Sequence, residues 1–392
     1  MPSESDRLEK LLSGFPREDF DLLVETRRDL HRHPELAYQE IRTAEVVAGR
    51  LLGLGLEPRT GVGKTGVLAD AGAAGPRLLV RADMDGLPIV EASGEPFASE
   101  VVGRMHACGH DGHVAIALAV AGRLGSESTA PPLRFLFQPA EEGGGGARAC
   151  VADGAMEDVR GAIGLHLWNQ MPVGKVGIYR GAMMAAVDEF EIGVVGRGGH
   201  GAAPHETSDS IVAAARIVEA LQGIVSREVS PLESAVVTVA SIHGGDAFNI
   251  IPSTVRLTGT VRWFSEATGA AMPAKIGRIV SGTAAAAGVS AHLDYRKINR
   301  PVVNDAEVAD AVIDVARRLL GEENVDTETR TLGGEDMSEY LDRVPGCFFF
   351  VGSAPAGPHR PHHSPSFAID ERALAVGVVL LETAARKLAG AS

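Results

Sequence analysis

Apolar positions in the first part of the chain alternate between helix-like spacing and short strand-like runs. Residues 18–32, 39–52 and 110–124 have the helical spacing, and the strand-like runs are 77–81, 133–137 and 161–165. Apolar residues three and four positions apart indicate amphipathic helices, and short apolar runs bounded by turn residues indicate buried strands. Strands that alternate with helices predict an α/β fold, with a mostly parallel sheet flanked by helices.

From residue 188 the order of elements changes to strand, helix, strand, strand, helix, strand. The segments concerned are 189–195, 209–227, 235–242, 255–264, 268–287 and 289–295. This order is that of a ferredoxin-like α+β unit. After Pro301 the first pattern resumes, with predicted elements at 307–320, 347–351 and 371–388. We therefore predict a discontinuous catalytic domain, residues 1–187 and 300–392, with a lid or dimerisation domain inserted at 188–299.

Composition and charge narrow the class of protein. A chain of 392 residues usually forms more than one domain. A formal net charge of −14 without any basic run disfavours nucleic acid and anionic membranes as partners. Only three cysteines are present, which indicates a reducing compartment. Residues 1–21 lack the apolar core of a signal peptide, and no apolar run reaches the length of a membrane span. These features predict a cytoplasmic protein.

The segment Met105-His-Ala-Cys-Gly-His-Asp-Gly-His113 concentrates candidate metal ligands in nine residues. Thiolate and neutral imidazole are ligands that zinc and similar cations prefer. Cys108 and His110 are the strongest candidates, and His106 and His113 are weaker ones. A buried structural cysteine beside a histidine at a helix start would explain the same residues equally well.

A pair of acids, Glu141 and Glu142, follows the run at 133–137 and precedes four glycines. Neighbouring side chains at the end of a strand point in different directions, so one acid can bind metal while the other faces a substrate. A hydrolytic metal site needs such a base to accept a proton from water and return it to the leaving group. Two exposed acids in a surface turn remain the alternative.

Further candidates lie at other predicted strand ends, where ligands bind in open α/β sheets. His166 follows the run at 161–165, and His363 lies in a loop that also carries His362. Either site could instead be structural or exposed. Asp83 and Asp85 follow the run at 77–81, and Asp85 is the better candidate to accept the second N–H of a ligating histidine.

Three residues of the inserted domain are candidates for substrate contacts. His200 lies in a glycine-rich loop and could donate a hydrogen bond to an oxyanion. Asn249 and Arg262 could orient a substrate carboxylate. For His200, a tight connection between a strand and a helix explains the local sequence slightly better.

Taken in order, these motifs resemble the metallohydrolase family of aminoacylases, glutamate-releasing carboxypeptidases and dipeptidases. The similarity is strongest to the branch of hippurate hydrolases, auxin–amino-acid conjugate hydrolases and bacterial N-acyl-amino-acid amidohydrolases. It extends from about residue 25 to the C-terminus. The matching segments are Arg81-Ala-Asp-Met-Asp-Gly-Leu-Pro88, Met105-His-Ala-Cys-Gly-His-Asp111, Phe137-Gln-Pro-Ala-Glu-Glu-Gly-Gly-Gly-Gly146, Gly198-Gly-His-Gly201, Phe248-Asn-Ile-Ile-Pro252 and His363-Ser-Pro-Ser-Phe367.

The resemblance implies a site for two divalent cations, which would be Zn²⁺, Mn²⁺, Co²⁺ or Ni²⁺. The implied ligands are Cys108, His110, Glu142, His166 and His363. His363 is preferred to its neighbour because it occupies the motif position before Ser-Pro.

The resemblance also implies a role for each of the remaining site residues. Glu141 is the implied general base and acid. The inserted domain is expected to form a homodimer, in which His200 and Asn249 serve the partner's active site. The implied reaction is hydrolysis of an N-acyl-L-amino acid to a carboxylic acid and a free amino acid.

Three other functions fit parts of the pattern. A dipeptidase or carboxypeptidase would apply the same chemistry to a different acyl group. A thiol hydrolase would use Cys108 as nucleophile with a nearby histidine as base. A non-catalytic metal or peptide binder would have no need of Glu141 beside the ligands.

Overall fold

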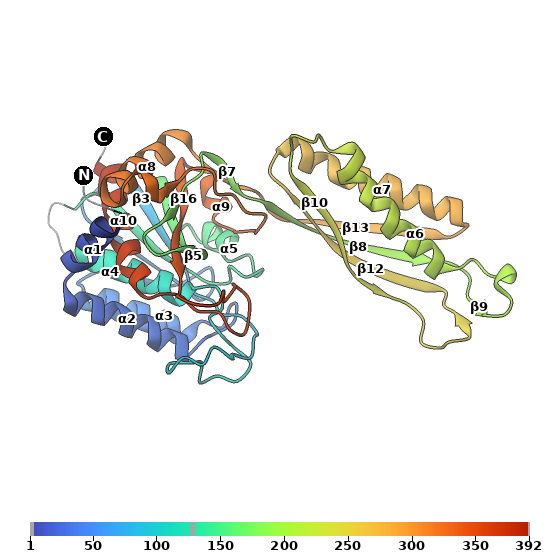
Figure 1. The fold of residues 1–392 in the computed structure, drawn as a ribbon, viewed down its shortest axis with the longest axis horizontal. Coiled ribbons are helices and arrows are strands. Elements are labelled where there is room, and N and C mark those ends of the chain that lie inside the picture. Colours follow the sequence, from blue (N-terminus) through green and yellow to red (C-terminus); the bar gives the residue numbers. More distant parts are fainter. Residues whose placement is uncertain (1–3, 126–129, 391–392) are drawn as a thin grey trace. The chain divides into compact units, whose positions relative to one another are not determined.

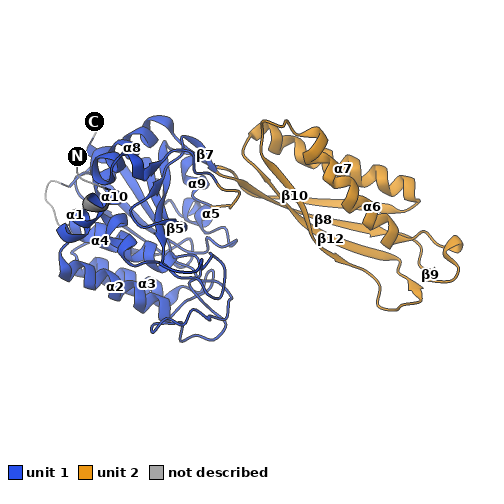
Figure 2. Ribbon diagram, viewed as in Figure 1, with its two compact units in different colours: residues 1–183, 302–330, 336–392 blue, residues 184–301, 331–335 orange. Residues whose placement is uncertain are grey.

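A computed structural model describes residues 4–125 and 130–390, and the chain divides into two compact units (Figure 2). Unit 1 consists of Met1–Met183, Val302–Arg330 and Asp336–Ser392. Unit 2 consists of Met184–Pro301 and Thr331–Glu335. Each unit has its own cluster of buried apolar side chains. The chain therefore folds around two separate hydrophobic cores.

Unit 1 is built on an eight-stranded sheet in the order β1-β2-β4-β3-β5-β16-β6-β15. Its strands are β1 (Arg59–Val62), β2 (Gly66–Ala71), β3 (Arg77–Asp83), β4 (Leu133–Gln138), β5 (Val159–Pro172), β6 (Val176–Gly177), β15 (Val325–Asp326) and β16 (Gly346–Ala354). A separate pair is formed by β7 (Gly181–Met184) and β14 (Val302–Asn304). The four central strands β4, β3, β5 and β16 are parallel. Their carboxyl ends therefore meet at one edge of the sheet.

Helices cover this sheet, as Figure 1 shows for α4 and α10. The helices of unit 1 are α1 (Glu4–Gly14), α2 (Arg17–Arg32), α3 (Ile41–Gly53), α4 (His110–Gly125), α5 (Gly146–Ala152), α8 (Ala306–Leu320), α9 (Ser338–Leu341) and α10 (Arg372–Gly390). Helix α4 contacts α2, α3 and α10 as well as β3, which explains why it is apolar almost all round. Among the described residues, no helix is both long and apolar enough to cross a bilayer.

Unit 2 contains an antiparallel four-stranded sheet in the order β10-β12-β8-β13. Its elements are β8 (Ala186–Val195), β9 (Gly199–His200), α6 (Ser210–Gly223), β10 (Ala235–His243), β11 (Ile250–Ile251), β12 (Thr254–Trp263), α7 (Glu266–Ala287) and β13 (Ser290–Asn299). Helices α6 and α7 lie on one face of the sheet (Figure 1). Accordingly, buried residues alternate with more exposed ones along β8 and β12. The predicted α/β class and the ferredoxin-like order of the inserted elements are confirmed.

Some predicted elements differ in extent from the observed ones. The helix expected at 209–227 begins at Ser210, because the Asp209 side chain accepts hydrogen bonds from the N–H groups of Ile211 and Val212. It ends at Gly223 and continues as a wider turn, Ile224–Glu228. Strand β5 is much longer than the run at 161–165. Strands β1 and β2 were not predicted; β1 has four residues and is largely exposed, so it has little apolar signal.

The contact between α7 and the sheet of unit 2 yields a stability prediction. A Cβ atom at Gly269 would lie 2.3 Å from the indole of buried Trp263, whereas a Cβ at Gly282 on the same helix would meet nothing within 4 Å. We expect Gly269→Ala to destabilise unit 2 by about 1–3 kcal/mol through overpacking. Gly282→Ala should stabilise it by about 1 kcal/mol, because alanine favours helix. Calorimetric melting of both variants should show midpoint shifts of opposite sign; an unchanged midpoint for Gly269→Ala would contradict the packing.

Candidate metal centre

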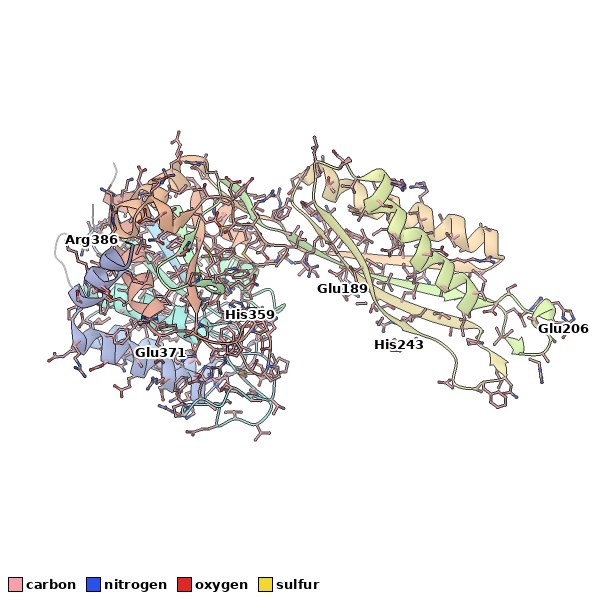
Figure 3. All side chains as sticks on the ribbon, in the orientation of Figure 1. Glu189, Glu206, His243, His359, Glu371 and Arg386 are labelled. Carbon is pink, nitrogen blue, oxygen red and sulfur yellow. The ribbon has the colours of Figure 1, made fainter. Side chains whose placement is uncertain are left out.

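The carboxyl ends of the parallel strands bring the predicted ligands of unit 1 together. They come from the loop before α4 and the first residue of that helix, from the loop after β4, from strand β5 and from the loop after β16. Figure 3 labels His359 in the last of these loops. The residues concerned are Cys108, His110, Glu141, Glu142, His166 and His363.

Ligand atoms in this group are separated by distances that suit metal coordination. The sulfur of Cys108 lies 3.4 Å from Nε2 of His166 and 3.4 Å from Nε2 of His363. Oε1 of Glu142 lies 3.2 Å from Nε2 of His363 and 3.9 Å from Nε2 of His110. Neighbouring ligands of a tetrahedral zinc ion, with bonds of about 2.0–2.3 Å, are roughly 3.3–3.8 Å apart. Cys108 belongs to two groups of three possible ligands, one with His110 and His166 and one with Glu142 and His363.

Two buried polar atoms in this cluster support the fit of a cation. Within the described part of the chain, Nε2 of His110 and Oε1 of Glu142 take part in no contact with hydrogen-bond geometry, although Oε1 lies 3.2 Å from Nε2 of His363. Buried polar atoms rarely lack a partner. Both atoms face the other candidate ligand atoms of the cluster. A cation coordinated there would therefore give each of them a partner.

The electrostatics of the cluster also suit a cation. Burial, reinforced by the charges of Glu142 and Glu141, raises the pKa of the Cys108 thiol well above its usual value. Burial disfavours the charged form of His110. The carboxylates of Asp83 and Asp85 outweigh this effect of burial and raise the pKa of His110 to about 10. Both side chains therefore hold protons that a divalent cation would displace.

Hydrogen bonds to the backbone orient the histidine rings. Nδ1 of His110 donates to the main-chain carbonyl of Asp85 at 2.9 Å, and Nδ1 of His166 donates to the carbonyl of Leu167 at 2.9 Å. Each ring therefore presents Nε2 to the cluster. His113 differs, because its Nε2 accepts from the N–H of Leu167 at 2.9 Å and its Nδ1 donates to a carboxylate. With both nitrogens engaged, His113 supports the site rather than binding metal.

The structure separates the roles of the two adjacent histidines in the loop after β16. The ring of His363 faces Cys108, and the backbone N–H of His363 donates to the carbonyl of Ala107 at 2.9 Å. His362 instead donates from Nε2 to the carbonyl of Leu167 at 3.0 Å and stacks on Trp168 with ring centroids 5.0 Å apart. The geometry therefore makes His363 the better ligand.

Residues 140–147 form a tight turn, named here the acidic loop, which positions both glutamates. The N–H groups of Glu141 and Glu142 each donate to the carboxylate of Asp85 at 3.0 Å. A Cβ atom at Gly146 would lie 1.6 Å from the carbonyl oxygen of Pro139, so only glycine fits there. Atoms of Glu141 and Glu142 also lie within 4.8 Å of a ring nitrogen of His110. The carboxylate of Asp85 thus orients the acids, while its main-chain carbonyl orients that histidine.

A buried arginine holds the strand ends together behind the cluster. The Arg81 guanidinium donates to Gln138 at 2.9 Å, to Asp83 at 2.7 Å and to Asp336 at 2.9 Å. Asp83 also accepts from His113 at 2.6 Å. The sequence patterns did not indicate the role of Arg81 and Gln138. A detectable signal was a charged residue inside an apolar strand, because a buried arginine requires acidic partners.

The three predicted substrate-contacting residues all belong to unit 2. His200 on β9 and Asn249 before β11 are brought together, because these strands pair and the N–H of Gly201 donates to the carbonyl of Asn249 at 2.8 Å. Arg262 lies eight residues along β12 from Thr254, which at about 3.3 Å per residue is roughly 26 Å from the start of that strand. Within unit 2, Arg262 is therefore apart from the other two residues.

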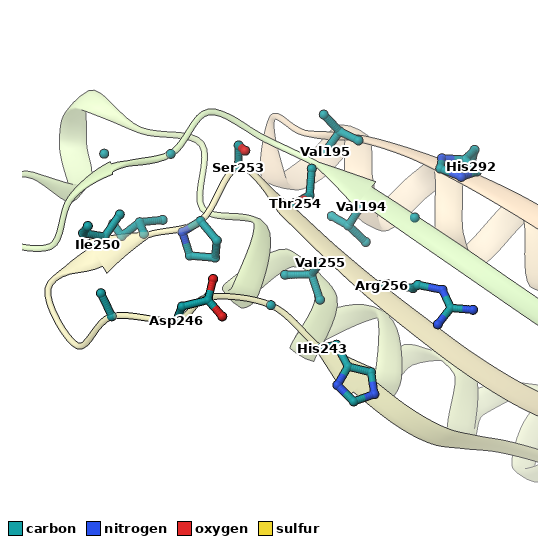
Figure 4. A pocket seen from close by; sticks show the side chains of 18 of the residues that line it. Val194, Val195, His243, Asp246, Ile250, Ser253, Thr254, Val255, Arg256 and His292 are labelled. Carbon is teal, nitrogen blue, oxygen red and sulfur yellow. The ribbon is translucent and has the colours of Figure 1, made fainter.

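The face of the unit 2 sheet that carries Arg256 has an open groove of about 1040 Å³ (Figure 4). His243, Arg256, Gly193 and His292 lie in one row across its four strands. Arg256 pairs with Glu191 at 2.6 Å. Among the described residues, none of this row belongs to a group that could hold a metal ion. The candidate metal centre is thus the cluster of unit 1.

Comparisons with known proteins agree with this architecture. The family model described as "Peptidase family M20/M25/M40" matches residues 79–387. An N-acetyl-L-cysteine deacetylase of Bacillus subtilis is 40% identical over 370 residues, covering 93% of this chain and 88% of the relative. Thermostable carboxypeptidase 2 of Saccharolobus solfataricus is 37% identical over 385 residues, covering 95% of this chain and 97% of the relative.

A solved structure of a family member is similar to this chain over nearly its whole length. It is that of a Bacillus subtilis protein described as a dinuclear metal binding peptidase from the M20 family. The TM-score is 0.84 at 33% identity, and the match covers 96% of this chain and 99% of the other. Since a family model and relatives of this similarity span most of its length, the chain belongs to peptidase family M20/M25/M40.

Proposed function

We propose that this protein is a metal-dependent amidohydrolase that cleaves N-acyl-L-amino acids to a carboxylic acid and a free amino acid. The convergence of five ligand side chains beside Glu141 carries the proposal. The deacetylase relative supports an N-acyl amino acid as the substrate class. The M20 relative that binds two metal ions supports a dinuclear site.

In this proposal two divalent cations bind at the cluster of unit 1. The ligands are Cys108, His110, Glu142, His166 and His363. Thiolate, imidazole and carboxylate together accommodate Zn²⁺, Mn²⁺, Co²⁺ or Ni²⁺. When bound, such ions polarise an amide carbonyl and acidify water.

Glu141 is the proposed general base and acid. The backbone N–H groups of Glu141 and Glu142 both donate to the carboxylate of Asp85. The two side chains therefore extend from a turn that is held in place. Glu142 serves as ligand, and Glu141 accepts the proton of the attacking water. It then delivers that proton to the nitrogen of the departing amino acid.

The inserted domain supplies the proposed substrate contacts within a homodimer. Nδ1 of His200 accepts a hydrogen bond from the N–H of Ala202 at 3.0 Å, so the neutral ring carries its proton on Nε2. That N–H can donate to the developing oxyanion, and the adjacent Asn249 can bind the substrate. Because Arg262 is remote from both, it would contact the same substrate only from the other subunit.

The proposed location is the cytoplasm. All three cysteines are buried and free. Free thiols are typical of a reducing compartment. The proposed partner is a small-molecule substrate, an N-acyl amino acid, in keeping with the deacetylase relative.

Carboxypeptidase activity is the second candidate, because one relative with this coverage is named a carboxypeptidase. The ligands and the general base would be unchanged. Only the acyl side of the scissile amide would differ. Substrate comparison is therefore the experiment that separates the two functions.

The first prediction concerns substrate class. With added Mn²⁺, Zn²⁺ or Co²⁺, we expect hydrolysis of N-acetyl and N-benzoyl amino acids at a higher kcat/KM than of dipeptides. Amino-acid release should stop with EDTA and return with metal. Activity that survives EDTA but is lost with iodoacetamide would instead support Cys108 as nucleophile, and a preference for dipeptides would support the peptidase.

The second prediction concerns the general base. We expect Glu141→Gln to retain bound metal and to lower kcat by at least about a hundredfold, since proton transfer contributes roughly 10²–10⁴-fold. The matched variant Glu142→Gln should lose metal, because it removes a ligand. Metal content by mass spectrometry and kcat should be measured on both. Full turnover by a metal-replete Glu141→Gln protein would refute this role.

The third prediction concerns pH. Cys108 and His110 both have raised pKa values, so metal must compete with their protons. Affinity for Co²⁺ should therefore rise steadily from pH 6 to pH 8. Titration of the metal-free protein, followed by the thiolate–cobalt absorption band, would measure it. An affinity independent of pH would contradict the assignment of these ligands.

A further inference from the structure

The segment 38–40 contacts the acidic loop at two points. Buried Glu40 accepts a hydrogen bond from the N–H of Ala140 at 2.9 Å, and its other oxygen accepts from the hydroxyl of Thr65 at 2.6 Å. The hydroxyl of Tyr38 donates to the carbonyl of Gly144 at 2.8 Å. One short segment thus holds both the start and the middle of the loop.

Ala140 has a backbone conformation that needs such support. Its φ is 54°, in the left-handed region that alanine rarely adopts, and its side chain is fully buried. Strained residues of this kind persist only where their surroundings hold them. The bond to Glu40 provides that restraint from a carboxylate that is itself 0% exposed.

Two residues in nearby turns also have a left-handed backbone conformation. Tyr38 has φ 61° and Lys64 has φ 84°, and the Lys64 ammonium lies 3.6 Å from the centroid of the Tyr38 ring. Backbone strain concentrated around one loop is typical of functional sites. The left-handed residues therefore form a connected support for the acidic loop.

We infer that Glu40 is a positioning residue for Glu141, an inference that rests on the proposed function. Three consecutive N–H groups, those of Ala140, Glu141 and Glu142, are accepted by two buried carboxylates, Glu40 and Asp85. Asp85 fixes the two acids, and Glu40 fixes the left-handed residue before them. Loss of the Glu40 contact would let Ala140 relax and turn Glu141 away from the substrate.

Glu40→Met is the test variant, because it keeps the bulk of the side chain and removes the acceptor. Glu35→Met is the matched control. Glu35 lies three residues before the segment 38–40, and its side chain accepts hydrogen bonds from the N–H groups of Arg42 at 3.0 Å and Thr43 at 2.8 Å, at the start of α3. The side chain of Glu35 therefore holds the start of α3 and not the acidic loop. Melting curves of both variants would establish that they fold.

The first measurement does not depend on catalysis or metal. Hydrogen exchange followed by mass spectrometry should show residues 140–147 exchanging at least about tenfold faster in Glu40→Met. In Glu35→Met the loop should exchange as in the wild-type protein. If the loop of the Glu40→Met variant exchanged at the rate of the wild-type protein, the inference would be overturned. This outcome can be read even if the wild-type protein hydrolyses none of the proposed substrates.

The second measurement is kinetic, at saturating Mn²⁺. We expect Glu40→Met to lower kcat roughly ten- to a hundredfold, as misplacement of a catalytic group does, with KM changed less than about threefold. Adding Ala140→Gly should restore most of kcat, because glycine adopts the left-handed conformation without strain. Ala140→Gly alone and Glu35→Met should stay within about threefold of wild type. Failure of the rescue, or an equal loss in Glu35→Met, would refute the positioning role.

Discussion

The concentration of buried negative charge at one edge of a parallel sheet is the constraint on which the rest of the structure depends. Asp83 and Asp336 are neutralised by Arg81, which reaches both from the middle of β3. Cys108 and Glu142 lie among histidines instead, and burial holds the pKa of His166 well below its usual value, so that ring stays neutral. Buried carboxylates at low dielectric require compensating positive charge, and a bound cation that displaced the protons of Cys108 and His110 would supply it. The fold therefore creates a site whose chemistry calls for metal.

Two of the candidate ligands, His110 and His363, lie beside or near residues that are anchored by contacts from elsewhere in unit 1. Asp111, next to the ligand at the start of α4, accepts from Arg27 at 2.7 Å and from His31 at 2.8 Å. Arg360, in the loop that carries His363, donates to Glu95 at 2.7 Å. Such outer contacts set the direction of the ligands and so the geometry of the metal site. This explains why polar residues penetrate so far into the core of this unit.

Two buried carboxylates hold the backbone of the acidic loop at three consecutive residues. Asp85 accepts the N–H groups of the two acids, and Glu40 accepts that of the strained residue before them. A base that must accept and later deliver a proton has to be held at a fixed place throughout. Rigid backbone contacts achieve this without engaging the reactive side chain itself.

The sequence by itself determined the α/β class and the ferredoxin-like order of the inserted elements, and the resemblance of its short motifs to a known family implied the set of candidate ligands. Those features depend on local periodicity and on residue types at short spacing. Tertiary structure alone showed that both nitrogens of His113 are engaged, that His362 turns to a backbone carbonyl, and that Arg262 is remote from Asn249. Likewise, Glu40 and Ala140 meet across 100 positions. Hydrogen-bond partners depend on the path of the folded backbone, which local patterns do not specify.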